Sequence, residues 1–204
     1  MLTAAGMCDN YTRPMSSARV LDEEILERFE AALRCVGAAI VDAWAPGLRD
    51  DEIDALVQPL GIALPEEARV WWRWHDGLRP GRGPQSWDLL PGRSLLSLED
   101  ALDLFVPERE HMADDGFPDM LLTPVTRHPI ILFGCDGAPD APVPVYVMDD
   151  WSDEAPRLAL PSIGELVLTW TSYIDTGIVT TGPDGDWLYD DKALSQEVQE
   201  LGVY

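Results

Sequence analysis

Two stretches near the N-terminus carry apolar residues at helical spacing. In the first, every third or fourth residue is apolar: Ile25, Phe29, Leu33, Val36 and Ile40. Residues three and four apart lie on one face of a helix, so this spacing predicts an amphipathic helix from Asp22 that Pro46-Gly47 stops. The second stretch predicts a shorter helix from about Asp51 to Leu60, which Gly61 closes.

The segment ALPEEARVWWRWHDG predicts a third helix with its own start and stop signals. Pro65 suits the first helical position, and Gly77 suits the left-handed residue that follows a helix. Trp71 and Trp72 lie on the apolar stripe of this helix, so we expect both indoles in the core. Trp74 lies beside the stripe. Of the three tryptophans, it is the one that we expect to be most exposed and therefore the most plausible ligand contact.

Short strands and a fourth helix are predicted between residues 86 and 105. SWDLLP and RSLL, on either side of Pro91-Gly92, read as short strands. SLEDALDLF predicts a helix with Ser97 as its N-cap and Asp100 in the capping-box position. Residues 107–128 are polar and irregular, and no regular element is expected there.

The C-terminal half predicts strands, then a helix, then a hairpin. HPIILFG, PVPVYVMD and RLAL have the composition of strands. PSIGELVLTWTSYIDTG has helical spacing, VTTGPDGDWLYD is typical of a β-hairpin, and a last helix is predicted from Asp191 to Leu201. This order indicates an α+β fold, with a mixed or antiparallel sheet flanked by helices. We expect residues 1–20 to form a loose N-terminal lead and residues 21–204 to form a single domain.

The charge of the chain narrows the kinds of partner that it can bind. Its 204 residues include 37 acidic side chains and 14 lysines and arginines, which gives a formal net charge of −23. A polyanion of this kind is repelled by nucleic acid and by anionic membranes, and it attracts basic proteins at a raised association rate that salt reduces. A role in solubility alone is the alternative explanation of this charge.

The cysteines and the hydropathy of the chain indicate a cytoplasmic protein. Cys8, Cys35 and Cys135 are odd in number, widely spaced and without a CxxC motif, which fits reduced thiols better than a disulfide framework. No run of about 18 apolar residues exists, and no signal peptide is recognised. We therefore expect no membrane span.

His75 and Asp76 are the residues that most resemble a catalytic pair. They are adjacent, however, and neighbouring helical residues point about 100° apart, which is poor geometry for a hydrogen bond between them. The sequence also lacks a GxSxG nucleophile motif. We therefore favour a structural role for both residues, with the histidine at a helix C-terminus and the aspartate in a turn, and predict no catalytic residue.

The histidines predict no metal site, and no cofactor is expected. His75, His111 and His128 are far apart in the sequence, and no HExxH motif occurs. The segment MDDWSDE is different, because four acids surround one tryptophan in an expected turn after a strand. A solvated loop is the alternative interpretation of this segment. The residues that we predict to contact a partner are Asp149, Asp150, Trp151, Asp153 and Glu154, together with Trp74.

Several segments occur in an order that is typical of one family. They are LGIALPEEARVWWRWHDG, Trp87, LLPGRSLLSLEDAL, a paired-strand stretch and PSIGELVLTW, and they cover roughly residues 50–175. Leu-Pro-Glu precedes an aromatic helix, an acidic residue and Gly end it, Ser-Leu-Glu opens the next helix, and Ser-x-x-Glu-Leu opens a later one. In these features the chain resembles the SMI1/KNR4 family of the SUKH superfamily. The WWRW segment is richer in tryptophan than the family pattern. It is therefore open whether the surface that it forms has a role that is specific to this protein.

The resemblance implies a SUKH-type α+β fold and a non-enzymatic binding module. In bacteria such domains are often immunity proteins that neutralise a cognate toxin, frequently a nuclease, whereas fungal relatives are regulatory scaffolds linked to cell-wall synthesis. The acidic composition favours the first use independently, because a nuclease site must be basic to hold phosphate. Three hypotheses therefore stand: an immunity protein that occludes a basic toxin, a scaffold without a toxin partner, and a hydrolase that uses His75 and Asp76.

Overall fold

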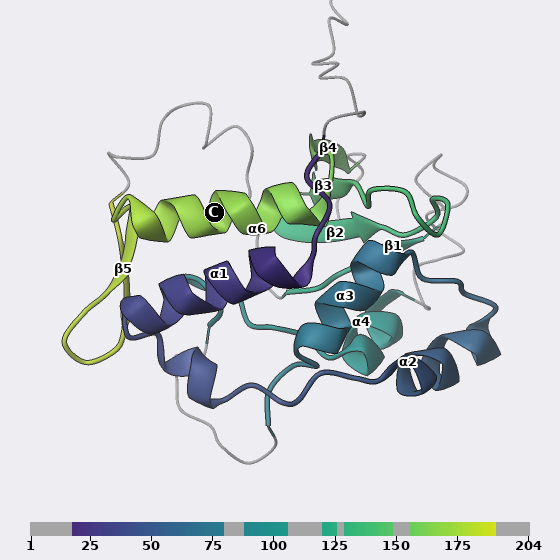
Figure 1. Cartoon of the computed structure of the whole chain (residues 1–204), viewed down its shortest axis with the longest axis horizontal. Coiled ribbons are helices and arrows are strands. Elements are labelled where there is room, and N and C mark those ends of the chain that lie inside the picture. The colour runs from purple at the N-terminus through teal and green to yellow at the C-terminus, as the bar shows by residue number, and fades with distance from the viewer. Residues whose placement is uncertain (1–17, 80–87, 106–119, 126–128, 149–155, 191–204) are drawn as a thin grey trace, which may run out of the picture.

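The computed structural model describes residues 18–79, 88–105, 120–125, 129–148 and 156–190, and these residues form an α+β fold. The described part contains five α-helices, a four-stranded sheet and a β-hairpin. In chain order the elements are α1 (Glu23–Cys35), the 3-10 helix η2 (Ala39–Asp42), α2 (Asp50–Val57), the 3-10 helix η3 (Gln58–Leu60), α3 (Glu66–Trp74), α4 (Leu98–Phe105), β1 (Leu121–Leu122), β2 (Ile130–Gly134), β3 (Val145–Met148), β4 (Arg157–Leu160), α6 (Ile163–Asp175), β5 (Val179–Thr181) and β6 (Trp187–Tyr189). Figure 1 shows α1 and α6 side by side, with β5 at the far end of α6.

The first helix is shorter than its apolar pattern predicts. Asp22 caps it by accepting a hydrogen bond from the Ile25 backbone N–H at 2.9 Å. The helix ends at Cys35 because Gly37 adopts a left-handed backbone with φ 75°, and the Ala38 N–H then donates to the Leu33 carbonyl at 3.0 Å. The prediction of one helix up to Pro46 is therefore wrong, since a glycine divides the segment into α1 and η2.

Gly47 has a packing role where the sequence suggested a helix stop. A Cβ at this position would lie 1.7 Å from the carbonyl oxygen of Arg73. The chain runs here against the C-terminal end of α3, and the Leu48 N–H donates to the Trp72 carbonyl at 2.9 Å. Only a residue without a side chain allows this close approach.

The start of α3 is close to the prediction, but its end is not where the glycine suggested. Pro65 is the N-cap of α3, one position before the first helical residue. The helix ends at Trp74, and His75 is already extended. Gly77 is left-handed, with φ 72°, but it lies in the turn beyond the helix end and does not directly follow the helix.

The next helix begins as its capping signal predicts, with one difference in detail. The Ser97 hydroxyl oxygen accepts a hydrogen bond from the Asp100 backbone N–H at 3.1 Å, which is the expected N-cap contact. The Asp100 carboxylate accepts the Ser97 hydroxyl proton at 2.6 Å. In a capping box it would accept from the Ser97 backbone N–H, so only half of that motif is present.

The sheet is antiparallel, with the strand order β1-β2-β3-β4. The predictions of strands in HPIILFG, PVPVYVMD and RLAL are confirmed, as are the α6 helix and the β5–β6 hairpin. The predicted strands SWDLLP and RSLL are wrong, because their described residues form only isolated bridges, Leu90–Arg93 and Leu95–Val125. Strand β1 lies within the segment expected to be irregular. It has only two residues, which is too few to show the alternation of apolar and polar residues that predicts a strand.

One face of the sheet packs against the helices and forms the main core. Successive strand residues point to opposite faces, so Ile131 and Phe133 join the cluster that contains Phe29 of α1 and Trp170 of α6. A smaller cluster forms on the opposite face. Its buried members are Leu121, Ile130, Leu132 and Met148.

The described end of the predicted N-terminal lead packs on α6. The Ser162 hydroxyl donates to the Arg19 carbonyl at 2.6 Å, and the Arg19 N–H donates to Glu165 at 3.2 Å. Residues 1–17, and the helix predicted from Asp191 to Leu201, lie outside the described residues. None of the helices in the described ranges combines the length and the apolar character that crossing a bilayer needs.

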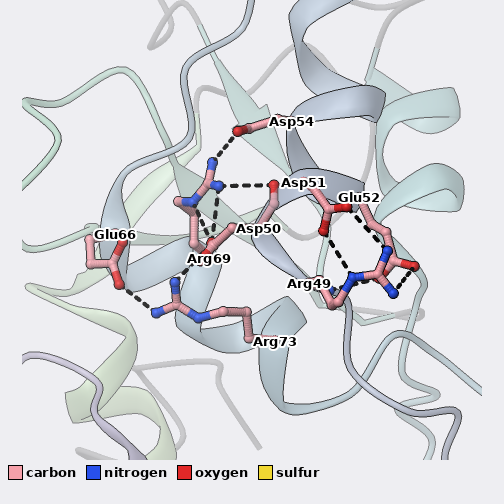
Figure 2. A network of polar contacts seen from close by, with 8 residues as sticks. All are labelled: Arg49, Asp50, Asp51, Glu52, Asp54, Glu66, Arg69 and Arg73. Carbon is pink, nitrogen blue, oxygen red and sulfur yellow. Dashed lines mark hydrogen bonds and ion pairs between the residues drawn. The ribbon is translucent and has the colours of Figure 1, made fainter.

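A network of arginines and carboxylates joins α2 to α3 (Figure 2). Arg69 of α3 pairs with Asp50 at 3.0 Å and with Asp54 at 2.9 Å, both on α2. Arg73 pairs with the same Asp50 at 3.0 Å and also with Glu66 on its own helix. Only 16% of the Arg69 side chain is exposed, so water screens its ion pairs less than those of a fully solvated arginine.

Replacing Arg69 with methionine is expected to lower the free energy of unfolding by about 1 kcal/mol, because the change removes ion pairs between two helices but keeps the apolar stem. The matched control is Arg49→Met, since within the described ranges Arg49 pairs only with Asp51 and Glu52 of the adjacent helix and is 69% exposed. Urea unfolding at low and high salt measures both variants. Equal losses for the two variants would contradict this interpretation of the network.

Candidate functional site

Trp71 and Trp72 are core residues, as their spacing predicts. Neither side chain has any solvent exposure. The ring of Trp71 lies edge-on to Phe133 of β2, with ring centres 5.7 Å apart, and its centre is 6.3 Å from that of Trp170 on α6. Both indole N–H groups lack a hydrogen-bond partner among the described residues. These two rings therefore contribute apolar packing between α3, the sheet and α6.

Trp74 is half-buried and is the most exposed of the three tryptophans. Its ring lies edge-on to Trp44 at 4.8 Å and also packs on Phe29 and Trp71. Its indole N–H donates to Glu30 at 3.3 Å. The ring is thus held in one orientation by α1 on one side and by the 43–49 segment on the other.

His75 and Asp76 point to different parts of the molecule. His75 Nδ1 lies 3.0 Å from the Ala45 carbonyl oxygen, and the imidazole stacks on Trp44 with ring centres 4.3 Å apart. Asp76 instead accepts a hydrogen bond from the Leu98 N–H at 2.7 Å, at the start of α4. Each side chain therefore ties the end of α3 to a different segment, and the geometry expected of a catalytic His–Asp pair is absent from this part of the structure.

The imidazole of His75 favours its neutral form. Burial lowers the pKa of His75, and its hydrogen bond to Ala45 and the nearby Glu30 carboxylate only partly oppose this effect. Because a carbonyl oxygen can only accept, Nδ1 carries the proton in this form. Burial also raises the pKa of Asp76.

The lowered pKa of His75 predicts a loss of stability in mild acid. An unfolded histidine takes up its proton near the ordinary pKa of 6.5, and the folded one does so only at lower pH. The unfolded state then binds more protons, so the contribution of His75 is complete above pH 6.5 and is lost as the pH falls through the folded pKa. Urea unfolding between about pH 7.5 and about pH 5 measures the free energy of unfolding. The part of its decrease that comes from His75 should be present in the wild type and absent in His75→Phe. Parallel curves for the two proteins would show that the histidine does not titrate in this way.

A hollow of about 340 Å³ lies between α1 and α3. The α1 side presents residues at the spacing i, i+3, i+4 and i+7, which share one helical face. The α3 side presents the last turn of its helix and the residue after it. The lining residues are Glu23, Leu26, Glu27, Glu30, Val70, Arg73, Trp74 and His75.

The three glutamates of the hollow differ in how their charge is balanced. Burial on its own would raise the pKa of Glu30, but hydrogen bonds from Arg34 and Trp74 outweigh it, and the pKa of Glu30 is lowered. Glu23 and Glu27 are exposed, and neither belongs to an ion pair within the described ranges. Arg73 is already paired with Asp50 and Glu66. The rim of the hollow therefore has excess negative charge.

The structure describes only one of the residues that the sequence predicts to contact a partner. Trp74 lines the hollow, whereas residues 149–155, and with them Asp149, Asp150, Trp151, Asp153 and Glu154, lie outside the described residues. The hollow was not predictable from the sequence, because its two sides are forty or more residues apart in the chain. The available signal was the spacing of Glu23, Glu27 and Glu30, which places the three glutamates on one face of α1.

Neither a metal site nor a similarity to known proteins indicates a function for these residues. Among the described residues, no group of three or more His, Cys, Asp or Glu side chains is placed to hold a metal ion. Cys135 is buried, which raises the pKa of its thiol well above the ordinary value and leaves it protonated at neutral pH. No protein-family model matches the chain, and no curated protein matches it either.

Proposed function

We propose that this chain is a non-enzymatic, cytoplasmic immunity protein with an SMI1/KNR4-type (SUKH) fold, and that it neutralises a basic, nuclease-type toxin by binding it. The single observation that carries this proposal is the surplus of negative charge, −23 over the chain. Part of this surplus lies at the rim of the hollow, which Trp74 also lines. The α+β arrangement of helices and an antiparallel sheet agrees with the family that the sequence resembles.

Electrostatics explains why such a surface suits such a partner. A nuclease holds phosphate with lysine and arginine, so its active site attracts any well-placed polyanion. Opposite charge raises the rate of encounter, and a few desolvated contacts then set the lifetime of the complex. An acidic protein can in this way compete with nucleic acid for the same basic cleft.

The acids of the MDDWSDE segment are proposed to take part in the encounter with the partner. Replacing Asp149, Asp150 and Asp153 with asparagine and Glu154 with glutamine should slow association about tenfold and flatten its salt dependence. Stopped-flow mixing with the purified partner measures both effects. The matched control neutralises four acids elsewhere in the chain that the structure describes as exposed: Asp136, Asp140, Asp184 and Asp186. If the control variant slows association as much, the segment has no special part in binding.

The proposed function is tested by capture and rescue. The tagged chain is incubated with lysate of the cells that produce it, at low and at high ionic strength, and the captured proteins are identified. We expect one basic protein that is released by salt, that arrests growth when it is expressed alone, and whose nuclease activity the purified chain inhibits. A captured protein that is neither toxic nor a nuclease would contradict the proposal and support a regulatory scaffold.

A further inference from the structure

We propose that the hollow between α1 and α3 receives an arginine side chain of the partner protein. The inference rests on the proposed function for the existence of a basic partner, but it identifies the place on this chain and the chemical group that the place binds. It follows from three features of the hollow: its apolar wall, its acidic rim, and the fixed position of the side chains that form both.

The wall of the hollow suits the stem and the plane of an arginine. Val70 and Trp74 are half-buried and provide apolar contact for a methylene chain, Trp74 through its indole ring, and Leu26 also lines the hollow with 3% of its surface exposed. Guanidinium groups stack on aromatic rings better than ammonium groups do, because they are planar and weakly hydrated. The volume of about 340 Å³ is at the small end of ligand-binding clefts and therefore suits one side chain.

The rim of the hollow suits the charge of an arginine. Glu23 and Glu27 lie one helical turn apart on α1, so both carboxylates border the same opening. A guanidinium has five N–H donors in a rigid fork and can satisfy two carboxylates simultaneously. Arg73 also lines the hollow, but it is engaged by Asp50 and Glu66, so Glu23 and Glu27 have no ion-pair partner among the described residues.

The other contacts in the hollow fix its shape before a ligand enters. Glu30 accepts hydrogen bonds from both Arg34 and the Trp74 indole, which links the two helices across the hollow. His75 stacks on Trp44 and lies 4.6 Å, between ring centres, from Trp74. A ring that is held in this way loses little conformational entropy on binding, which favours affinity.

The experiment uses a defined probe, so it does not depend on finding the partner. The full chain, labelled with ¹⁵N, is titrated with N-acetyl-arginine amide and, in parallel, with N-acetyl-citrulline amide, which has nearly the same shape without the charge. The indole N–H signal of Trp74 is the readout, and Trp74→Phe identifies that signal. We expect a saturable shift with the arginine amide and none with the citrulline amide.

Matched variants on one helix separate the hollow from the overall charge. Glu23→Gln and Glu27→Gln should each weaken binding of the arginine amide by about fivefold, because each removes a carboxylate close to the bound guanidinium. Glu24→Gln makes the same change at an exposed position of α1 that does not line the hollow, and should weaken binding by less than about twofold.

Three results would overturn the inference: no saturable shift, an equal shift with the citrulline amide, or equal effects of Glu24→Gln and Glu27→Gln. Failure of the arginine site can be distinguished from failure of the proposed function. If a basic toxin is captured but the arginine amide does not bind, the immunity role stands and the site is wrong. If the amide binds as expected and no basic partner exists, the cation site stands and the immunity role is wrong.

Discussion

Replacing Glu67 with alanine is expected to lower the free energy of unfolding by about 5 kcal/mol. Only 1% of Glu67 is exposed, and its carboxylate accepts three backbone N–H groups from different segments. Oε1 accepts from Leu21 at 2.7 Å and from Gly164 at 2.8 Å, and Oε2 accepts from Val143 at 2.5 Å. Each buried N–H that loses its partner costs about 1–3 kcal/mol, so the three losses together are severe.

The position of Glu67 predicts that other side chains replace it poorly. Its carboxylate joins α3 to the segment before α1, to the segment before β3 and to the first turn of α6. Burial raises the pKa of Glu67, and the backbone N–H groups that it accepts from oppose that effect. In Glu67→Gln, an amide NH₂ replaces one acceptor oxygen and must face at least one N–H donor, so this variant should lose about half as much stability as Glu67→Ala.

The matched control for Glu67 is its neighbour Glu66, which is 59% exposed and pairs with Arg73 on the surface. Glu66→Ala should cost at most about 1 kcal/mol. Urea unfolding followed by tryptophan fluorescence, with circular dichroism as a second probe, measures the variants. If Glu66→Ala and Glu67→Ala lost the same stability, the carboxylate of Glu67 would not be the link between these segments.

Replacing Trp71 with alanine is expected to lower the free energy of unfolding by about 3–5 kcal/mol. The fully buried ring lies between Phe133 of the sheet and Trp170 of α6, so its removal leaves a cavity at the centre of the main cluster. Trp71→Phe keeps an aromatic ring in the same place and should cost less than half as much.

The same unfolding measurement, combined with a measurement of partner affinity, distinguishes a structural role of Trp71 from a role in binding. A loss of stability in Trp71→Ala, with partner affinity unchanged under conditions where the variant is folded, is the expected result. A variant of unchanged stability that no longer binds its partner would show instead that Trp71 belongs to the binding surface. It would also remove the argument that binding depends on the acidic exterior.

Elements with strong local signals were predictable from the sequence. Asp22, Ser97 and Ser162 each precede a helix and cap it by accepting a backbone N–H, and such caps are short-range features. Three strands of the sheet, β2, β3 and β4, and the β5–β6 hairpin were predictable from composition and turn residues, whereas β1 was not. The end of α1 was not, because the buried Ile40 continues the apolar period after Gly37 has already ended the helix.

Features that depend on tertiary contacts were not predictable. Glu66 and Glu67 carry the same sequence signal, two acids in the first turn of a helix, and yet one is exposed and the other is at the centre of three segments. Only the packing of α1 and α6 on α3 separates their roles. The hollow is a similar case, since it needs the face of α1 that contains Glu23 and Glu27 to meet the end of α3 at Trp74.

The most direct test of the proposed function is the association rate constant of the chain with its purified partner over a series of ionic strengths. We expect the rate constant to fall steeply and continuously as salt is added, because the acidic exterior steers a basic macromolecule into contact. A rate constant that stays constant across the series, for a partner that still binds, would contradict it.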